Sequence, residues 1–381
     1  MFTASEHHPQ ILGPECYTSQ EQHEAEMEHL FRPGWHCVGV TDEAPKEGNF
    51  KTLEVFGQPL IVWNSGGEYH TFLNVCAHRF SLLTNKPSGK MPILKCQYHG
   101  WEYDETGNTR KIPDAKSFRP LAPGMLCLTK YRTETCGRLI FMTMAKTGPS
   151  LRDYLGDGYD RVLEWFPPEV KHCLCLMKDF NVNWKVQIEN AMETYHTTEV
   201  HPKSFGDFLT EEQCRHDFGP SYSKLTVDYS KEHSFRTYLD TWGHFCVGAK
   251  PRYKYEHMLF YPNFMLARLS LFTWFESMLP ISPGRSFSLG HAYCYSGKPG
   301  RPLTFFNNLW VSRYGHGFVS QLAREDGSVL PDVQRGLEAG LVPRGGLIST
   351  REERLTHFQE YVAQTTGCRR FDLQTPQAAA G

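Results

Sequence analysis

Two cysteines and two histidines occur in the sequence at spacings that suit metal binding. Cys76 and His78 are separated by one residue, Cys96 and His99 by two, and seventeen residues lie between the two pairs. Structural zinc sites usually pair cysteine with cysteine and histidine with histidine. Each pair here supplies one ligand of each kind, so the spacing disfavours a zinc site.

A mixed pair in each of two loops is the donor set of a Rieske-type [2Fe-2S] cluster. In such a cluster two thiolates hold one iron and two imidazoles hold the other. Neutral imidazoles reduce the negative charge of the site and raise its reduction potential above that of an all-cysteine cluster. We therefore predict that Cys76, His78, Cys96 and His99 bind a cluster that accepts single electrons.

A second candidate site lies in residues 183–205. Glu193 falls on a predicted helix, His196 follows one turn later, and His201 lies five residues further on. Five residues turn a regular helix by about 140°, so the two imidazoles can share a metal only where the helix bulges or ends near Thr197. A regular helix with two solvent-exposed histidines is the alternative interpretation.

A third ligand would complete this site. Two histidines and one carboxylate form the common ligand set of non-haem iron that reacts with O2. Residues 322–340 contain Glu325, Asp326 and Asp332. Acidic residues on a helix face are usually solvated, so the residues alone leave the choice open.

The elements that would position these residues fall into two groups. Short β-branched and aromatic runs, separated by glycine and proline, predict a small antiparallel sheet between residues 36 and 144. The rest of the chain mixes strands with helices at 183–196 and 350–365, an α+β pattern. Its strands are expected at 173–184, 263–280, 286–295 and 303–311.

Domain boundaries follow from composition. A helical segment capped by Ser19 is expected near the N-terminus, and residues 145–150 have the composition of a linker. We therefore predict an N-terminal helical segment at 1–35, a β domain at 36–148 and an α+β domain at 149–381.

Composition excludes some partners. The chain has 381 residues and a formal net charge of -2, which gives no electrostatic reason to expect binding to nucleic acid or to an anionic membrane. The N-terminus lacks the pattern of an export signal, and no stretch is apolar enough to span a bilayer, so a cytoplasmic protein is expected. Cysteines other than Cys76 and Cys96 are expected to be reduced and buried: Cys16, Cys37, Cys127, Cys136, Cys173, Cys175, Cys214, Cys246, Cys294 and Cys368.

The sequence resembles the α-subunits of Rieske non-haem iron oxygenases, the ring-hydroxylating oxygenase family, over roughly residues 20–365. The two Cys-His pairs, the Gly100-Trp101 dipeptide after the second pair, and the two later histidines carry the resemblance. It implies a small antiparallel β Rieske domain and a larger α+β domain of helix-grip, START-like type, whose antiparallel sheet holds mononuclear Fe(II). The implied iron ligands are His196, His201 and Asp326, which lies just ahead of the sequence VQRGL.

Glu193 departs from the family pattern. Most members have Asp at this position, where it bridges the iron-binding histidine to a cluster-binding histidine of the neighbouring subunit. The resemblance therefore implies a head-to-tail homotrimer in which electrons pass from His99 of one chain through Glu193 to His196 of the next. A glutamate here is similar to the carnitine and quaternary-ammonium oxygenase branch.

The predicted function is that of a terminal oxygenase. No dinucleotide-binding motif is present, so a separate reductase or ferredoxin must supply the electrons. We expect O2-dependent hydroxylation or oxidative demethylation of a small organic substrate such as an amine. The alternatives are ring dihydroxylation of an aromatic acid, a Rieske electron-transfer protein without oxygenase activity, and a zinc-stapled ligand-binding module.

Several aromatic residues are candidates for a substrate pocket. Aromatic residues in strands usually pack in a core, but some of those near the second site are candidates to line a pocket, where they would stack on an aromatic ring or surround an ammonium group. These candidates are Phe264, Phe272, Trp274, Phe275 and Tyr293.

Overall fold

The chain folds into two compact units. In the computed structural model, the larger unit comprises Met1–Phe31 and Arg161–Gly381, and the smaller unit comprises Arg32–Asp160. The sequence placed a domain boundary at residues 148 and 149, whereas the division between the units falls inside helix α4 (Asp157–Trp165). The described residues are 2–121, 124–201, 211–231, 235–297, 302–339 and 346–368.

The smaller unit is built on a seven-stranded antiparallel sheet with the strand order β2-β11-β10-β5-β4-β3-β6. Two-residue turns connect β3 to β4 and β4 to β5, and both residues of each turn have positive φ, the backbone that suits a tight hairpin. Glycine at Gly57, Gly66 and Gly67 meets that requirement. The strands are β2 (His36–Val40), β3 (Asn49–Val55), β4 (Gln58–Ser65), β5 (Glu68–Leu73), β6 (Ser88–Lys90), β10 (Lys130–Cys136) and β11 (Leu139–Thr143).

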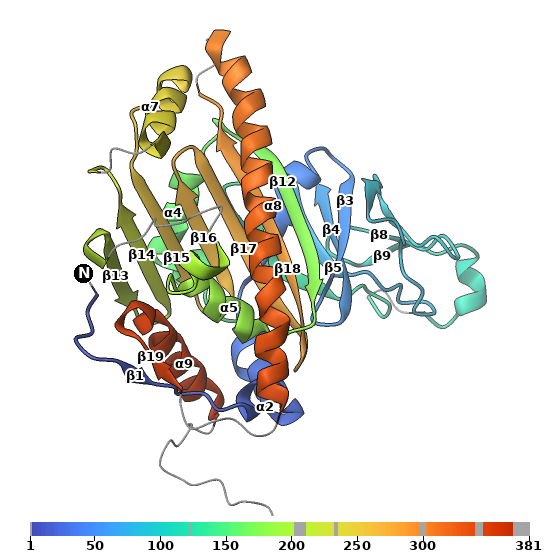
Figure 1. The fold of residues 1–381 in the computed structure, drawn as a ribbon. Helices are drawn as coiled ribbons and strands as arrows, with labels where there is room; N and C mark the ends of the chain where they lie inside the picture. The colour runs from blue at the N-terminus through green and yellow to red at the C-terminus, as the bar shows by residue number, and fades with distance from the viewer. Residues whose placement is uncertain are drawn as a thin grey trace, which may run out of the picture. The chain divides into compact units, whose positions relative to one another are not determined.

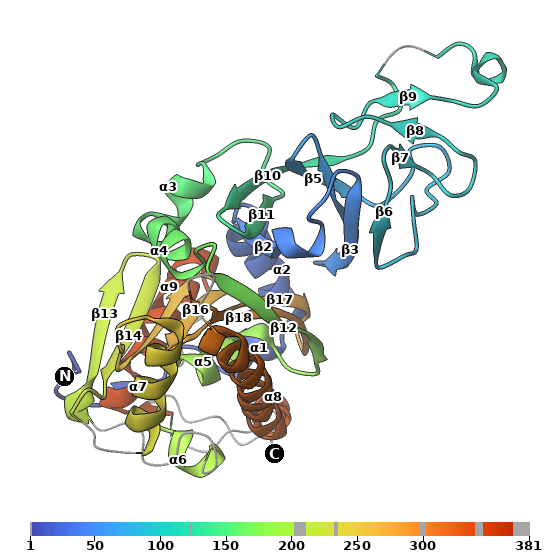
Figure 2. The ribbon, with the colours of Figure 1, turned by 90° about the horizontal axis from the view of Figure 1, so that it is seen from above.

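A three-stranded sheet, β7-β8-β9, completes the smaller unit and lies beside β6 in Figure 2. Its core contains Trp63, Phe72, Trp101 and Tyr103, all at most 2% exposed. This core supports the two loops that carry the Cys-His pairs. The remaining elements are β7 (Leu94–Lys95), β8 (Glu102–Tyr103), β9 (Thr109–Lys111), η2 (Thr41–Glu43), η3 (Ala115–Phe118) and α3 (Leu151–Leu155).

The larger unit contains a second seven-stranded antiparallel sheet, with the strand order β12-β18-β17-β16-β15-β14-β13. Helices α5 and α8 lie across one face of this sheet (Figure 1). The sheet and helices confirm the predicted α+β class. The strands are β12 (Val170–Phe180), β13 (Cys214–Gly219), β14 (Tyr222–Asp228), β15 (Lys254–Phe260), β16 (Phe264–Leu269), β17 (Phe272–Ser282) and β18 (Arg285–Tyr295).

Helices from both ends of the chain join this unit. Ser19 caps α2 by accepting a hydrogen bond from the Gln22 backbone N–H at 3.0 Å, as predicted. The strands β1 (His8–Pro9) and β19 (Leu347–Ile348) pair with each other, so the N-terminal segment is anchored beside the C-terminal helix. The helices are α1 (Glu15–Thr18), α2 (Gln20–Glu26), η1 (Met27–Phe31), α5 (Trp184–Met192), α6 (Thr197–Val200), η4 (Glu211–Gln213), α7 (Phe235–Val247), α8 (Pro302–Glu338), η5 (Thr350–Glu352) and α9 (Glu353–Thr366).

Three predictions are wrong. Cys175 is exposed and Cys127 and Cys173 are only half-buried, whereas all three were expected to be buried. Residues 303–311 belong to the long helix α8 and do not form a strand. The prediction failed because the periodicity of a short, mainly apolar run does not distinguish a strand from a helix. Cys16 and Cys368 are not free thiols but form a disulfide, with 6.4 Å between their Cα atoms. Pairing of β1 with β19 brings these cysteines together although 352 positions separate them in the sequence, and no local sequence pattern predicts such a contact.

Candidate functional site

The two Cys-His pairs of the smaller unit lie in loops of the same form. The carbonyl of Cys76 accepts a hydrogen bond from the backbone N–H of Phe80 at 3.1 Å, and that of Cys96 accepts one from Gly100, also at 3.1 Å. Phe80 and Gly100 have φ values of 60° and 72° at matching positions. Each loop therefore closes four residues after its cysteine and turns its histidine in the same sense.

The four side chains form a site in which the thiols are buried and the imidazoles are partly exposed. Cys76 and Cys96 are 1% and 2% exposed, and the rings of His78 and His99 are 4.6 Å apart. The phenol of Tyr103 lies 3.0 Å from the Cys76 sulfur. Burial raises the pKa of the Cys76 thiol, and metal binding would overcome this because metals bind the thiolate.

A Rieske cluster fits this donor set. Two thiols and two imidazoles are present, as the cluster requires. In addition, Nδ1 of His78 is buried and has no hydrogen-bond partner among the described residues, which leaves that nitrogen available to bind iron.

Three further side chains converge in the larger unit. The two Nε2 atoms of His196 and His201 are 3.2 Å apart. Asp326 Oδ1 lies 3.0 Å from Nε2 of His201 and 3.6 Å from Nε2 of His196. These atoms lie close enough together for one metal ion to contact all three residues, and the donor set suits non-haem iron.

A break in the helix brings the two histidines together. Helix α5 ends at Met192, Glu193 is extended, and α6 begins at Thr197. His196 and His201 therefore flank a four-residue helix instead of sharing one long helix. This break meets the condition that the sequence spacing imposed on a shared metal.

The Glu193 carboxylate stabilises the break and holds the first histidine. It accepts a hydrogen bond from the His196 backbone N–H at 3.2 Å and another from the Tyr195 backbone N–H. It also contacts Nδ1 of the His196 ring. The opposite nitrogen, Nε2, is thereby turned toward Asp326.

A second carboxylate, which the sequence did not single out for this role, holds His201. Glu325 Oε2 lies 2.9 Å from Nδ1 of His201. Thus each histidine has a carboxylate at Nδ1 and directs Nε2 to the shared site, the usual way in which metal-binding imidazoles are oriented. Burial lowers the pKa of His201, but its hydrogen bonds to Asp326 and Glu325 outweigh this and raise the pKa overall.

Residues remote in sequence fix the helix that precedes the break. The buried Lys185 ammonium lies 2.5 Å from Glu26, and the Trp184 indole N–H donates to the same carboxylate at 2.7 Å. At the other end of α5, Arg354 donates to the Met192 carbonyl at 2.8 Å. Asn190 donates to Asp326 at 2.9 Å, linking α5 to α8. Spacing along the chain did not indicate these contacts.

A cavity of about 200 Å³ adjoins the three converging residues. It is lined by residues of α5, α8 and the sheet face that these helices cover. Trp274 and Phe275 both contribute to its wall, but the Phe275 ring stacks on His291, with 5.3 Å between the ring centres, and so projects from the other face of the sheet. Phe264 and Tyr293 are instead buried outside the wall, and Phe272 packs in a separate cluster with Val247.

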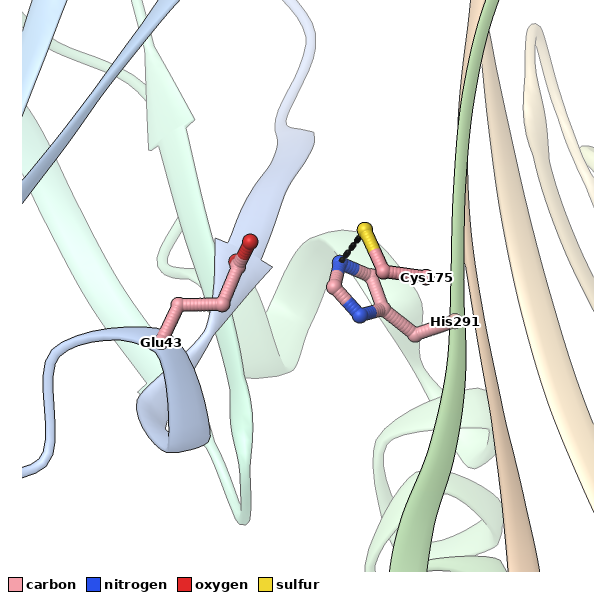
Figure 3. A group of neighbouring side chains, drawn as sticks. All are labelled: Glu43, Cys175 and His291. Atoms are coloured by element: carbon pink, nitrogen blue, oxygen red, sulfur yellow. Dashed lines mark hydrogen bonds between the residues drawn. The ribbon is translucent and has the colours of Figure 1, made fainter. Parts of the chain in front are cut away.

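A cysteine and a histidine also meet on the opposite face of this sheet (Figure 3). Cys175 Sγ lies 3.8 Å from Nε2 of His291, and His172 Nε2 lies 2.9 Å from Nδ1 of the same ring. Both ring nitrogens of His291 therefore already have protein partners in the larger unit. We assign this group a structural role.

Family models match both units. Residues 34–132 match the Rieske [2Fe-2S] domain, and residues 153–367 match the catalytic domain of the ring-hydroxylating alpha subunit. The second match alone covers more than half of the chain.

Curated relatives act on different substrates. The oxygenase subunit of glycine betaine monooxygenase from Pseudomonas aeruginosa is 31% identical over 200 residues, which cover 52% of this chain and 46% of the relative. The large subunit of anthranilate 1,2-dioxygenase from Acinetobacter baylyi is 28% identical and covers 58% and 48%. Chloroplastic choline monooxygenase from Spinacia oleracea is 24% identical and covers 92% and 76%. The chain thus spans about half the length of the relatives that match it first.

Solved structures share the fold. The quaternary ammonium Rieske monooxygenase CntA in complex with L-carnitine has a TM-score of 0.75 at 20% identity, over 93% of this chain and 95% of that one. Naphthalene 1,2-dioxygenase from Rhodococcus sp. has a TM-score of 0.74 at 17% identity, over 93% and 94%. Within the described ranges, no helix is both long and apolar enough to cross a membrane.

Proposed function

We propose that this chain, which belongs to the family of ring-hydroxylating alpha subunits, is the terminal oxygenase component of a multicomponent Rieske oxygenase. The family carries a [2Fe-2S] cluster and mononuclear iron. We assign the cluster to Cys76, His78, Cys96 and His99, and the mononuclear iron to His196, His201 and Asp326. The observation that carries this assignment is the convergence of two Nε2 atoms and one carboxylate oxygen at the mouth of a cavity.

The residues around this site have separate roles. When bound, mononuclear iron with this ligand set keeps positions open at which O2 is activated. Glu193 and Glu325 accept from Nδ1 of the two histidines and keep Nε2 directed inward. Apolar side chains of α5, α8 and the sheet line the cavity beside the reacting groups and reduce the access of water to them.

Electrons come from a separate reductase or ferredoxin in this proposal. The chain would form a homotrimer in which Glu193 accepts a hydrogen bond from His99 of a neighbouring subunit as well as from His196. A carboxylate between two imidazoles orients both rings and couples the two centres. The proposal places the enzyme in the cytoplasm.

The proposed reaction is hydroxylation or oxidative demethylation of a small organic substrate. Relatives that act on glycine betaine and choline support an amine. The anthranilate dioxygenase relative supports ring dihydroxylation of an aromatic acid as the second candidate. Oxygen-18 labelling separates the two, because a monooxygenase places one atom of O2 in the product and a dioxygenase places two.

Iron content tests the proposal. The enzyme should contain three irons per chain and show a reduced-cluster signal in electron paramagnetic resonance after anaerobic reduction. His196→Ala should lose one iron and keep that signal, whereas the exposed His316→Ala should lose none. Two irons, unchanged in His196→Ala, would instead identify an electron carrier, and zinc without iron would identify a ligand-binding module.

The electron route has its own test. Glu193→Gln keeps the shape of the side chain but removes its charge, so we expect both metal centres to be retained and oxidation of the reduced cluster by O2 and substrate to slow at least tenfold. Stopped-flow absorbance of the cluster measures this rate. Unchanged cluster oxidation in Glu193→Gln would contradict the proposed route.

A further inference from the structure

Two polar side chains on the sheet wall of the cavity each carry a group that the described residues leave unmatched: the Glu276 carboxylate has no cation, and Nε2 of His257 has no hydrogen-bond partner. Glu276 projects from β17 and His257 projects from β15, and both line the cavity. The wall around them is mainly apolar, including Leu176, Met265 and Met278. An unmatched polar or charged group in a mainly apolar wall is costly, so these two residues indicate what the cavity holds.

Glu276 is a carboxylate without a cation. Among the described residues it forms no ion pair; a hydrogen bond from Ser288 lowers its pKa, but burial, with a smaller contribution from Asp326, outweighs this and raises the pKa overall. Lys178 also lines the cavity, but its ammonium stands 4.6 Å from the centre of the Phe180 ring. Gly290 lies beside Glu276, and a Cβ at that glycine would be 3.7 Å from Glu276 Cγ. The same Cβ would lie 3.3 Å from the Phe275 carbonyl oxygen, so glycine is the residue that fits beside Glu276.

Trp274 makes this corner of the cavity suitable for a positive charge. It lies two residues before Glu276 on β17, so both side chains project from the same face of the sheet. An indole face attracts a cation, and it does so most strongly where water is excluded. A carboxylate and an indole side by side would bind an ammonium group that is too bulky for a single salt bridge.

His257 provides a neutral hydrogen-bond donor, in contrast to the negative charge of Glu276. Its Nδ1 lies 3.1 Å from Nη2 of Arg354. A guanidinium only donates hydrogen bonds, so Nδ1 must accept and the ring proton must sit on Nε2. Burial, reinforced by Arg354, lowers the pKa of His257 and keeps the ring neutral. Nε2 is buried and has no partner among the described residues, so its N–H is a donor that lacks an acceptor.

The strand register sets the separation of these two groups. Glu276 pairs with Met265, which pairs with Leu259, two residues beyond His257 on β15. Two strand spacings and a two-residue offset put the two Cα atoms about 12 Å apart. A small molecule lying between the side chains would reach both.

We infer that the cavity selects a small molecule that carries a cationic nitrogen and an acceptor oxygen, with Glu276 binding the nitrogen and His257 donating to the oxygen. The inference rests on the proposed function, because it takes this cavity as the substrate site. It narrows the substrate to betaine-like or amino-acid-like compounds and disfavours neutral aromatic rings.

Equilibrium binding to the iron-loaded enzyme, measured by calorimetry, tests both ends separately. Glycine betaine carries both groups, 3,3-dimethylbutanoate replaces its nitrogen by carbon, and tetramethylammonium lacks the carboxylate. Glycine betaine should bind at least tenfold more tightly than either of the other two. Equal affinity for glycine betaine and 3,3-dimethylbutanoate, or no binding of glycine betaine, would overturn the inference.

Variants of Glu276 and His257 test which residue binds the cationic nitrogen of the ligand and which binds its carboxylate. Glu276→Gln should weaken glycine betaine and tetramethylammonium at least tenfold and leave 3,3-dimethylbutanoate unchanged. His257→Phe should weaken the two carboxylates and spare tetramethylammonium, which thereby reports that the cavity is intact. His257→Gln should restore carboxylate binding, because its amide can accept from Arg354 and donate to the ligand. The exposed Glu169→Gln is the control and should change nothing.

The outcomes separate this inference from the proposed function. Three irons per chain with no discrimination among the three probes would overturn the inference alone. Two irons per chain with the expected binding pattern would overturn the oxygenase assignment and leave the recognition by Glu276 and His257 standing. A variant that affects all three probes equally would contradict the role given to its residue.

Discussion

At the scale of single residues, the candidate iron site depends on which nitrogen of each histidine faces inward. Both Nδ1 atoms have a carboxylate partner, Glu193 for His196 and Glu325 for His201. Removing such a partner typically weakens metal binding 10- to 100-fold. Glu325→Ala should therefore weaken Fe(II) binding in that range, measured by titrating iron into chelator-treated enzyme. Asp332→Ala, an exposed change on the same helix, is the control, and equal iron affinity in both variants would contradict the role of Glu325.

Sequence spacing predicted the candidate metal ligands, but it did not predict Glu325, which holds one of them in place. The break in α5 and the meeting of His196 with His201 could be anticipated, because their five-residue spacing fails on a regular helix. Glu325 reads as one more solvated acid on a helix, and its partner lies 124 residues away. Contacts of that kind arise only when the tertiary fold brings separate elements together.

At the scale of elements, the end of α5 is held by a residue of α9. Arg354 donates to the Met192 carbonyl at 2.8 Å and to the Ser223 hydroxyl at 3.1 Å, and it is fully buried. A hydrogen bond to a charged group contributes about 1.5–3 kcal/mol. Arg354→Met should therefore lower the free energy of unfolding by about 3 kcal/mol and reduce mononuclear iron, because Glu193 follows Met192 directly.

Urea unfolding of the iron-loaded enzyme and iron analysis measure these two effects. Arg335→Met, on an exposed part of α8, should change neither quantity. A stable Arg354→Met protein with full iron content would show that α5 ends at Met192 without help from α9.

The length of α8 explains why the strand predicted at residues 303–311 is wrong. A short apolar run fits a buried strand as well as a buried helix, and length decides between them. Here the helix continues for 37 residues and passes through Pro331. The second half of α8 carries Glu325 and Asp326, so the helix that was missed is the element that delivers the third ligand.

At the scale of the whole chain, the disulfide between Cys16 and Cys368 links its two ends. Loss of such a cross-link commonly costs about 2–5 kcal/mol. The double variant Cys16→Ser, Cys368→Ser should melt at a lower temperature than the oxidised enzyme, and reductant should lower the melting temperature of the wild type only. An equal melting temperature of the wild type with and without reductant would show that the disulfide does not contribute to the stability of the fold, as expected for a protein whose thiols are kept reduced in the cytosol.

Buried and half-buried histidines make the larger unit sensitive to acid. His216, His244 and His357 each have a lowered pKa, and burial is the main cause for all three. The folded ring stays neutral as the pH falls below about 6.5, whereas the ring in the unfolded chain takes up a proton. The unfolded state then binds more protons, so the free energy of unfolding must fall with the pH. Each histidine contributes up to about 1.4 kcal/mol per pH unit.

His244 allows this slope to be measured at one residue. Its Nδ1 lies 2.7 Å from the Asp240 carbonyl. Burial, with Arg268 and Arg252, lowers the pKa of His244 by more than this hydrogen bond and the Asp240 charge raise it. A glutamine can donate to the same carbonyl but cannot take up a proton, so His244→Gln should lose stability less steeply than the wild type between pH 6.5 and 5.5. Urea midpoints at pH 7.5, 6.5 and 5.5 give the slopes, and the exposed His316→Gln should match the wild type. Parallel slopes for all three proteins would mean that His244 is protonated equally in the folded and unfolded chains, contrary to its burial.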